Sequence, residues 1–138
     1  VYDDCMGEIA LSLSGLLNNA TLSPGDYLRQ LAALSEASPD LLAFMAIAPI
    51  ERARHIELKA PLGVEPLAVE AVVRRTVSQW SQAGRVAESA HLDALADALI
   101  ASIYGIVIYS SQVDPTVDRQ GIIEMFARLL DGQVWITP

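Results

Sequence analysis

The chain has very little of what most binding and catalytic chemistry uses. Its 138 residues include one cysteine (Cys5), one lysine (Lys59) and two histidines (His55 and His91). A single cysteine excludes an internal disulfide and is typical of a protein kept in a reducing cytosol. Cys5 lies on an apolar helical face, which favours a small core residue over a reactive thiol. We therefore expect a cytoplasmic protein.

Positive charge is also scarce. Nine lysines and arginines stand against 17 aspartates and glutamates, which gives a formal net charge of −8. Affinity for nucleic acid comes largely from neutralised phosphates, and no basic stripe is present to supply it. The residues of this chain are therefore not expected to contact DNA.

Motifs for catalysis and for metal or cofactor binding are absent as well. The sequence has no glycine-rich phosphate loop and no nucleophile elbow. Glu51 and His55 share a helical face, but no third metal ligand follows at a suitable spacing. The segment 114–118 lacks the later positions of a calcium loop and is interpreted as a helix start. His91 is expected at the surface. The chain is thus predicted not to be an enzyme and to need no cofactor.

Apolar surface, by contrast, is abundant. Hydrophobic residues make up 52% of the chain, which is high for a soluble monomer and fits extra surface buried in an oligomer. The longest uncharged run, Ala98–Val113, is shorter than the roughly 20 apolar residues of a spanning helix, so no membrane span is expected. The acidic start Val1-Tyr2-Asp3-Asp4 does not look like a signal peptide.

The apolar residues recur at helical spacing almost everywhere, and the one stretch with a strand-like pattern is 133–137. We therefore expect one all-α domain, residues 1–138, with about six helices. Ser23-Pro24 and Ser38-Pro39-Asp40 are helix start signals. A long helix follows the loop Ala60–Pro66 and ends at Gly84. Its inward side is predicted to be Val69, Val72, Val73, Thr76, Trp80 and Ala83, with Glu70 and Arg74 paired outside.

Two long apolar segments close the chain, Ala90–Gln112 and Thr116–Asp131. The first is apolar on every face in its second half, and such a helix must be covered on all sides. A chain of this length has little left to cover it, so we expect a second copy and a dimeric four-helix bundle. The second helix has an apolar stripe opposite a solvent side of Gln120, Glu124, Arg128 and Asp131. The predicted interface residues are Ala94, Ala98, Ala101, Gly105, Ile122, Phe126, Leu129 and Leu130.

The order of these elements resembles the C-terminal ligand-binding domain of the tetracycline-repressor (TetR) family of transcription regulators. The resembling features are the Ser38-Pro39-Asp40-Leu41-Leu42 start, the segment Arg75–Val86, the long helix with Tyr104-Gly105, and Asp114-Pro115 followed by a helix ending at Gly132. The resemblance implies dimerisation through the last two helices. It also implies that DNA is bound only through an N-terminal helix-turn-helix domain, which is absent from these residues. Ligand binding would then change operator affinity.

A small-molecule effector is the remaining chemical possibility. Candidate lining residues are Phe44, Met45, Trp80, Ile100 and Tyr104, with Arg54 or His55 near a mouth. Few charged residues fall on inward faces, so the effector is expected to be small, largely apolar and aromatic or fatty. The alternative is a homodimeric helical bundle with a structural or interaction role, whose core is filled by these same side chains.

Overall fold

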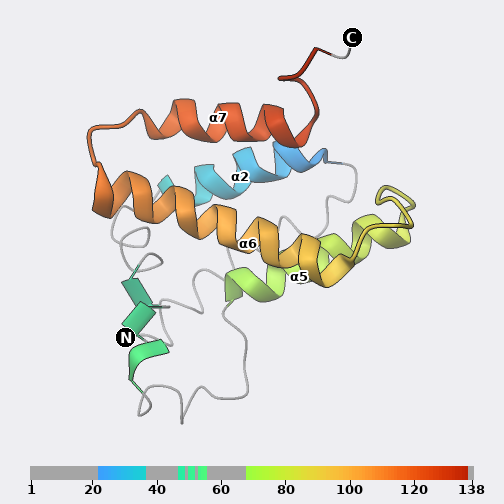
Figure 1. Cartoon of the computed structure of the whole chain (residues 1–138), viewed down its shortest axis with the longest axis horizontal. Coiled ribbons are helices and arrows are strands. Elements are labelled where there is room, and N and C mark those ends of the chain that lie inside the picture. The colour runs from blue at the N-terminus through green and yellow to red at the C-terminus, as the bar shows by residue number, and fades with distance from the viewer. Residues whose placement is uncertain (1–21, 37–46, 49, 52, 56–67, 137–138) are drawn as a thin grey trace.

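The computed structural model describes residues 22–36, 47–48, 50–51, 53–55 and 68–136 (Figure 1). Within these ranges the chain is helical and has no strand, which confirms the all-α class. The helices are α2 (Pro24–Glu36), α5 (Ala68–Gln82), α6 (Leu92–Ile108) and α7 (Arg119–Leu130). A π-helical stretch, η2 (Tyr109–Val113), continues α6. Short helical turns also occur within 47–54.

The helix ends follow from local hydrogen bonding. Ser23 caps α2, because its hydroxyl oxygen accepts from the Asp26 N–H at 3.0 Å. His91 caps α6, because its Nδ1 accepts from the Ala94 N–H. Asp118 caps α7, because its carboxylate accepts from the Gly121 N–H. These side chains satisfy donors that would otherwise have no helical partner. His91 is exposed, as expected, and the segment before α7 is a helix start.

Two glycines with positive φ end helices α5 and α7. Gly84 has φ 71°, and Gly132 has φ 69°. After α5, the Arg85 N–H donates to the Trp80 carbonyl and the Gly84 N–H to the Ser81 carbonyl. The same pattern closes α7 at Gly132. This pairing defines the Schellman motif, in which glycine takes the left-handed conformation at no steric cost.

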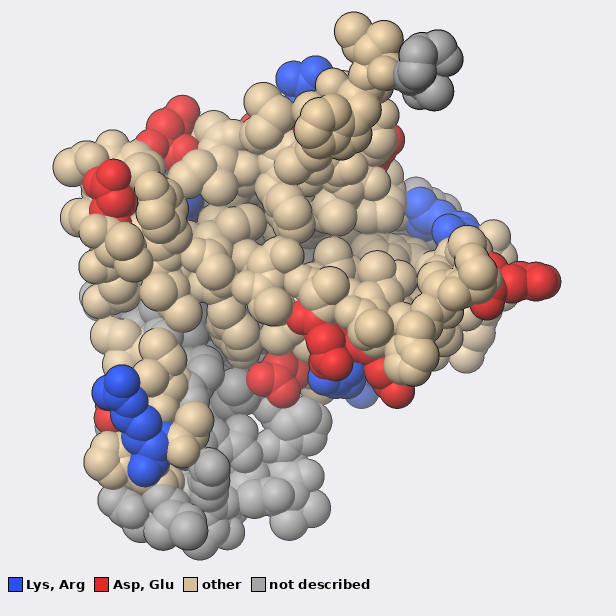
Figure 2. Space-filling view, viewed as in Figure 1, with Lys and Arg blue, Asp and Glu red and all other residues tan. Residues whose placement is uncertain are grey.

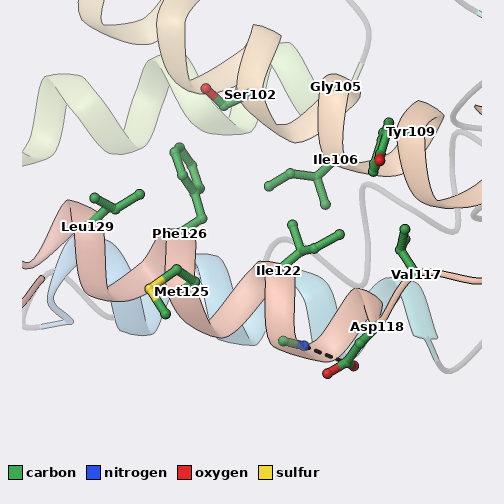
Figure 3. A pocket seen from close by; sticks show the side chains of 11 residues that line it. Ser102, Gly105, Ile106, Tyr109, Val117, Asp118, Ile122, Met125, Phe126 and Leu129 are labelled. Carbon is green, nitrogen blue, oxygen red and sulfur yellow. Dashed lines mark hydrogen bonds between the residues drawn. The ribbon is translucent and has the colours of Figure 1, made fainter. Parts of the chain in front are cut away.

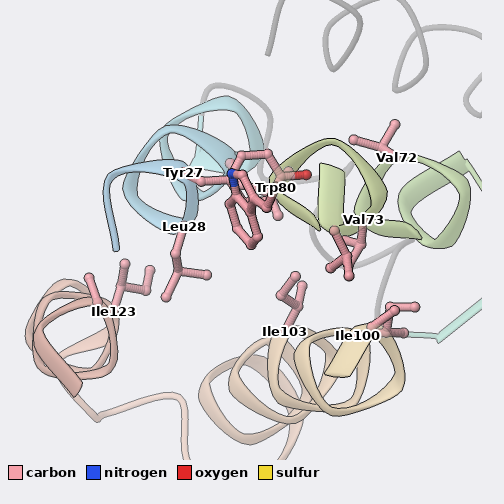
Figure 4. Packing of buried hydrophobic residues seen from close by; sticks show 12 residues of the cluster. Tyr27, Leu28, Val72, Val73, Trp80, Ile100, Ile103 and Ile123 are labelled. Carbon is pink, nitrogen blue, oxygen red and sulfur yellow. The ribbon is translucent and has the colours of Figure 1, made fainter. Parts of the chain in front are cut away.

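The helices pack as two pairs around a common core. Helix α7 lies against α2, and α6 lies against α5, whereas α6 and α7 contact each other much less. Figure 4 shows side chains from all four helices meeting between the pairs. Trp80 packs edge-on against Tyr27, with ring centroids 5.5 Å apart. The buried core consists of Tyr27, Leu28, Leu31, Val72, Val73, Val77, Trp80, Ala96, Ile100, Ile103, Ile123 and Ala127.

Several details of the helix faces differ from the prediction. Ala83 is exposed, whereas Val77 is 2% exposed and belongs to the core. Arg74 forms its ion pair with Asp97 of α6, at 2.5 Å, rather than with Glu70. Thr76, by contrast, is buried as predicted, and its hydroxyl donates to the Val72 carbonyl at 2.9 Å, so this polar group has a partner inside the core.

Asp131 was predicted on the solvent side of α7, and this prediction is wrong. Its side chain is only 11% exposed. One carboxylate oxygen accepts from the Ser23 hydroxyl at 3.0 Å and the other from the Gly25 N–H at 2.9 Å. The carboxylate therefore sits at the N-terminus of α2, where the helix dipole favours negative charge. Spacing within α7 alone could not reveal this partner.

Arg29 of α2 strengthens the same helix pair on the outside. It forms two 2.8 Å hydrogen bonds with the Glu124 carboxylate and one with Asp26. Hydrogen bonding from Arg29 lowers the pKa of Glu124. The ionised form of Glu124 is thus favoured in the folded protein, and this contribution is present above the ordinary pKa of glutamate.

We expect the contribution of Glu124 to stability to vanish in acid. A carboxyl group with a lowered folded pKa loses its stabilising effect as the pH falls through that pKa. Glu124→Gln should therefore lower the melting temperature at pH 7 and have no effect at pH 2. The measurement is thermal unfolding from pH 7 to pH 2, with Glu88→Gln in the α5–α6 loop as control. An equal destabilisation at both pH values would contradict the assignment.

Candidate functional site

The candidate site is an apolar groove between α6 and α7. Because these helices pack mainly on α5 and α2, their outer sides are left uncovered. The groove has a volume of about 850 Å³ and is largely open to solvent. It is lined by Ser102, Gly105, Ile106, Tyr109, Val117, Asp118, Gly121, Ile122, Met125, Phe126 and Leu129.

Phe126 occupies the middle of this groove. Figure 3 shows its ring rising from α7 toward α6, with Ile122 on one side and Leu129 on the other. Ile106 points into the groove from α6, and Tyr109 and Val117 lie at one end (Figure 3). Gly105 offers no side chain at all, and a Cβ added there would meet no atom within 4 Å. The side chains that line the groove are therefore mainly apolar. On α6, Gly105 leaves the helix backbone without a covering side chain.

The groove carries almost no charge. Its one ionisable carboxylate, Asp118, already accepts a 3.0 Å hydrogen bond from the Gly121 N–H. In Figure 2 the surface over α6 and α7 is mainly uncharged, and acidic side chains gather at its margins. Met125 and Leu129 nevertheless remain 48% and 37% exposed. An exposed apolar surface with a charged rim is typical of a protein interface.

The π-helical stretch gives one end of α6 its shape. The hydroxyls of Ser110 and Ser111 donate to the carbonyls of Ile106 and Val107, at 2.7 and 2.6 Å. Arg119 at the start of α7 donates from Nε to the Ser110 hydroxyl at 2.9 Å. These bonds satisfy the backbone where the α-helical pattern fails, so η2 is fixed to α7 rather than frayed. Sequence reasoning missed this element.

Four of the eight predicted interface residues line this groove. Gly105, Ile122, Phe126 and Leu129 line the groove together. The remaining α6 positions, Ala94, Ala98 and Ala101, are exposed. Leu130 is half-buried and packs against the core instead, as Phe126 partly does. The lining residues that were not predicted at the interface are Ser102, Ile106, Tyr109, Val117, Asp118, Gly121 and Met125. The absence of charge around Tyr109 was the available signal.

The predicted effector-binding residues that the structure describes lie outside this groove. Trp80 and Ile100 are buried in the core at 5% and 8% exposure, and Tyr104 packs against that core. Phe44 and Met45 lie outside the described residues. Among the described residues, Trp80, Ile100 and Tyr104 do not line the α6–α7 groove. A cavity around Trp80 therefore remains a sequence-based prediction.

Arg54 and His55 form a small exposed cluster with Glu51. The His55 Nε2 lies 3.2 Å from one Glu51 carboxylate oxygen, and the Arg54 guanidinium lies 3.9 Å from the other. All three side chains are more than 40% exposed. In the part of the chain that the structure describes, no group of three or more histidine, cysteine or acidic side chains could hold a metal ion.

The helix formed by α6 and η2 is longer than its uncharged run. It spans Leu92–Val113, or 22 residues, which by length and composition is enough to cross a membrane. The length of the uncharged run Ala98–Val113 therefore does not by itself exclude a membrane span for the whole helix. Core helices of soluble proteins pass the same test, but only 28% of the apolar window is buried here. Most of this apolar window is therefore left unburied by the subunit.

No protein-family model matches this chain, and neither a curated protein nor a solved structure is significantly similar to it. The resemblance to the TetR family rests on the residues quoted for it.

Proposed function

We propose that this chain is the dimerising, effector-binding half of a one-component transcription regulator, similar to the C-terminal domain of TetR-type proteins. The observation that carries the proposal is the uncharged α6–α7 face, centred on the groove around Phe126. A second copy of the same chain would cover it and form a bundle of four helices.

The character of the surface favours a second copy as its cover. The groove is too open to enclose a small molecule, which in typical pockets loses most of its surface to the protein. Each copy carries a net charge of −8, so two copies repel each other least when uncharged surfaces form the contact. The α6–α7 face meets that requirement, because acidic residues lie at its margins (Figure 2).

The effector is proposed to bind within each subunit, beside Trp80. A specific observation favours the ligand-free alternative, a structural or interaction dimer. Trp80 is only 5% exposed and contacts Tyr27 directly. An effector would therefore have to displace part of this packing to reach Trp80.

An effector is expected to be a small fatty or aromatic molecule that raises the melting temperature. Stabilisation should grow with the logarithm of the ligand concentration over its dissociation constant. The test screens fatty acids and small aromatic acids by thermal shift, and follows Trp80 fluorescence in a Trp135→Phe background. A hit that changes both signals supports the regulator. Absence of any shift across the panel favours the ligand-free dimer.

The chain alone is expected not to bind duplex DNA, because its net charge is −8. Binding to phosphates requires counterion release by basic side chains and weakens steeply with salt. A mobility-shift titration at moderate salt should show no complex up to high micromolar concentration. A complex that dissociates as salt rises would show that its arginines form a basic surface after all.

A further inference from the structure

Two apolar patches lie at opposite ends of the α6–α7 face. At one end, Tyr109 and Val113 of η2, here called the turn patch, are 47% and 65% exposed. At the other end, past α7, Trp135 and Ile136 are 76% and 95% exposed. Residues Gln133–Ile136, here called the arm, rise away from the helices (Figure 1). Neither patch contains a charged residue.

The direction of the arm is fixed at its base. The Gln133 N–H donates to the Arg128 carbonyl at 2.8 Å, and the Arg128 guanidinium donates back to the Gln133 carbonyl at 3.4 Å. Gly132 before it has φ 69°, a conformation that glycine adopts without strain. The arm therefore leaves α7 in a defined direction instead of folding over its own groove.

The arm does not reach the turn patch of its own subunit. Tyr109 lines the groove with Val117 and Asp118, beside the start of α7, whereas the arm begins after its end. The 12 residues of α7 separate the two ends by about 18 Å. Three residues from Gly132 to Trp135 extend over roughly 10 Å. Only another molecule can bring the two patches together.

We propose that the arm of each subunit packs on the turn patch of a second copy, with Trp135 against Tyr109 and Val113. This inference rests on the proposed dimer and specifies its geometry. The two-fold axis runs perpendicular to α6 and α7, so that the helices of the two copies are antiparallel across the interface. By symmetry the contact occurs twice, once at each end of the four-helix bundle.

The first experiment measures whether Trp135 is buried in the dimer. The difference between wild-type and Trp135→Phe emission isolates Trp135 without altering Trp80. We expect this signal to be blue-shifted and resistant to acrylamide in the dimer, and to become quenchable on dilution to monomer. A dimer in which Trp135 stays fully quenchable would overturn the arm contact and leave the dimer itself intact. A wild-type monomer at micromolar concentration would overturn both.

The second experiment identifies the partner of the arm. Trp135→Ala should raise the dimer dissociation constant at least about tenfold, because tryptophan anchors are typical hot spots. Gln133→Ala is the matched control in the same arm, since Gln133 acts there through its backbone. Val113→Ser should weaken the dimer too, and the double variant should be weaker by less than the product of the two effects. Independent effects would contradict the Trp135–Val113 pairing.

Discussion

Replacing Phe126 with glutamate is expected to turn a dimer into monomers. Phe126 points from α7 into the groove and also packs partly against the core (Figure 3). In the proposed four-helix bundle a carboxylate there would be buried without a partner in each subunit, at a cost of several kcal/mol per charge. Analytical ultracentrifugation at micromolar concentration should show a stable wild-type dimer and a dissociated variant.

A second variant separates loss of the dimer from loss of the fold. Met125→Glu places the same charge on a side chain that is already 48% exposed, so the monomer should fold normally and still fail to dimerise. Ser78→Glu, on the exposed side of α5, is the matched control and should leave the dimer intact. If Met125→Glu dimerises as tightly as the control, the α6–α7 face is not the interface.

The second large effect is expected at Gly25, where the backbone of α2 lies close to that of α7. A Cβ on Gly25 would lie 2.5 Å from the Ala127 carbonyl oxygen and would overlap the Asp131 carboxylate. Ala127 is fully buried, so the backbone of α7 has little room to move. Gly25→Ala should therefore destabilise the protein by about 2 to 3 kcal/mol through overpacking and a strained hydrogen bond. In thermal unfolding this corresponds to a loss of roughly 6 to 12 °C.

Gly105→Ala is the matched control for Gly25→Ala. The new methyl group meets no atom within 4 Å in the subunit, and alanine is the better helix former by about 1 kcal/mol. The monomer should therefore be as stable as wild type or more stable. If another helix approaches at Gly105, as proposed, the same substitution should weaken the dimer. Equal loss of stability at both glycines would contradict the close α2–α7 contact.

Local signals in the sequence predicted the helices well. Proline after serine marked the start of α2, and glycine marked the ends of α5 and α7, because these residues act through bonds within one or two turns. The inward residues Val72, Val73 and Trp80 followed from helical spacing and are buried. The all-α class needed no more than this. Pairing of the helices was beyond such signals, because periodicity shows which side of a helix is apolar but not what covers it.

The pattern therefore misplaced groups whose partners are distant in the chain. The spacing of apolar residues in α7 predicts Asp131 on the solvent side, yet its carboxylate accepts hydrogen bonds from Ser23 and Gly25. The spacing in α5 predicts an ion pair between Arg74 and Glu70, but Arg74 pairs with Asp97 of the neighbouring helix α6. For the same reason, only four of the residues that line the groove were predicted at the interface. Phe126 and Gly105 could be chosen from the sequence because of the size of their side chains. The positions of Tyr109 and Val117 in the groove depend on the contact between η2 and α7, which helical spacing does not predict.

The Asp131 carboxylate also has a consequence for the order in which the chain folds. It joins α7 to the N-terminus of α2 across 106 positions of sequence. Helices α5 and α6 are neighbours in the chain, so their contact closes a short loop and can form early. The contact between α2 and α7 can form only after α7 has been made, and a fold completed by such a distant contact forms more slowly than one built from local contacts. During synthesis, Tyr27 of α2 can already pack on Trp80 of α5, whereas the side of α2 that packs on α7 would stay exposed until α7 has left the ribosome.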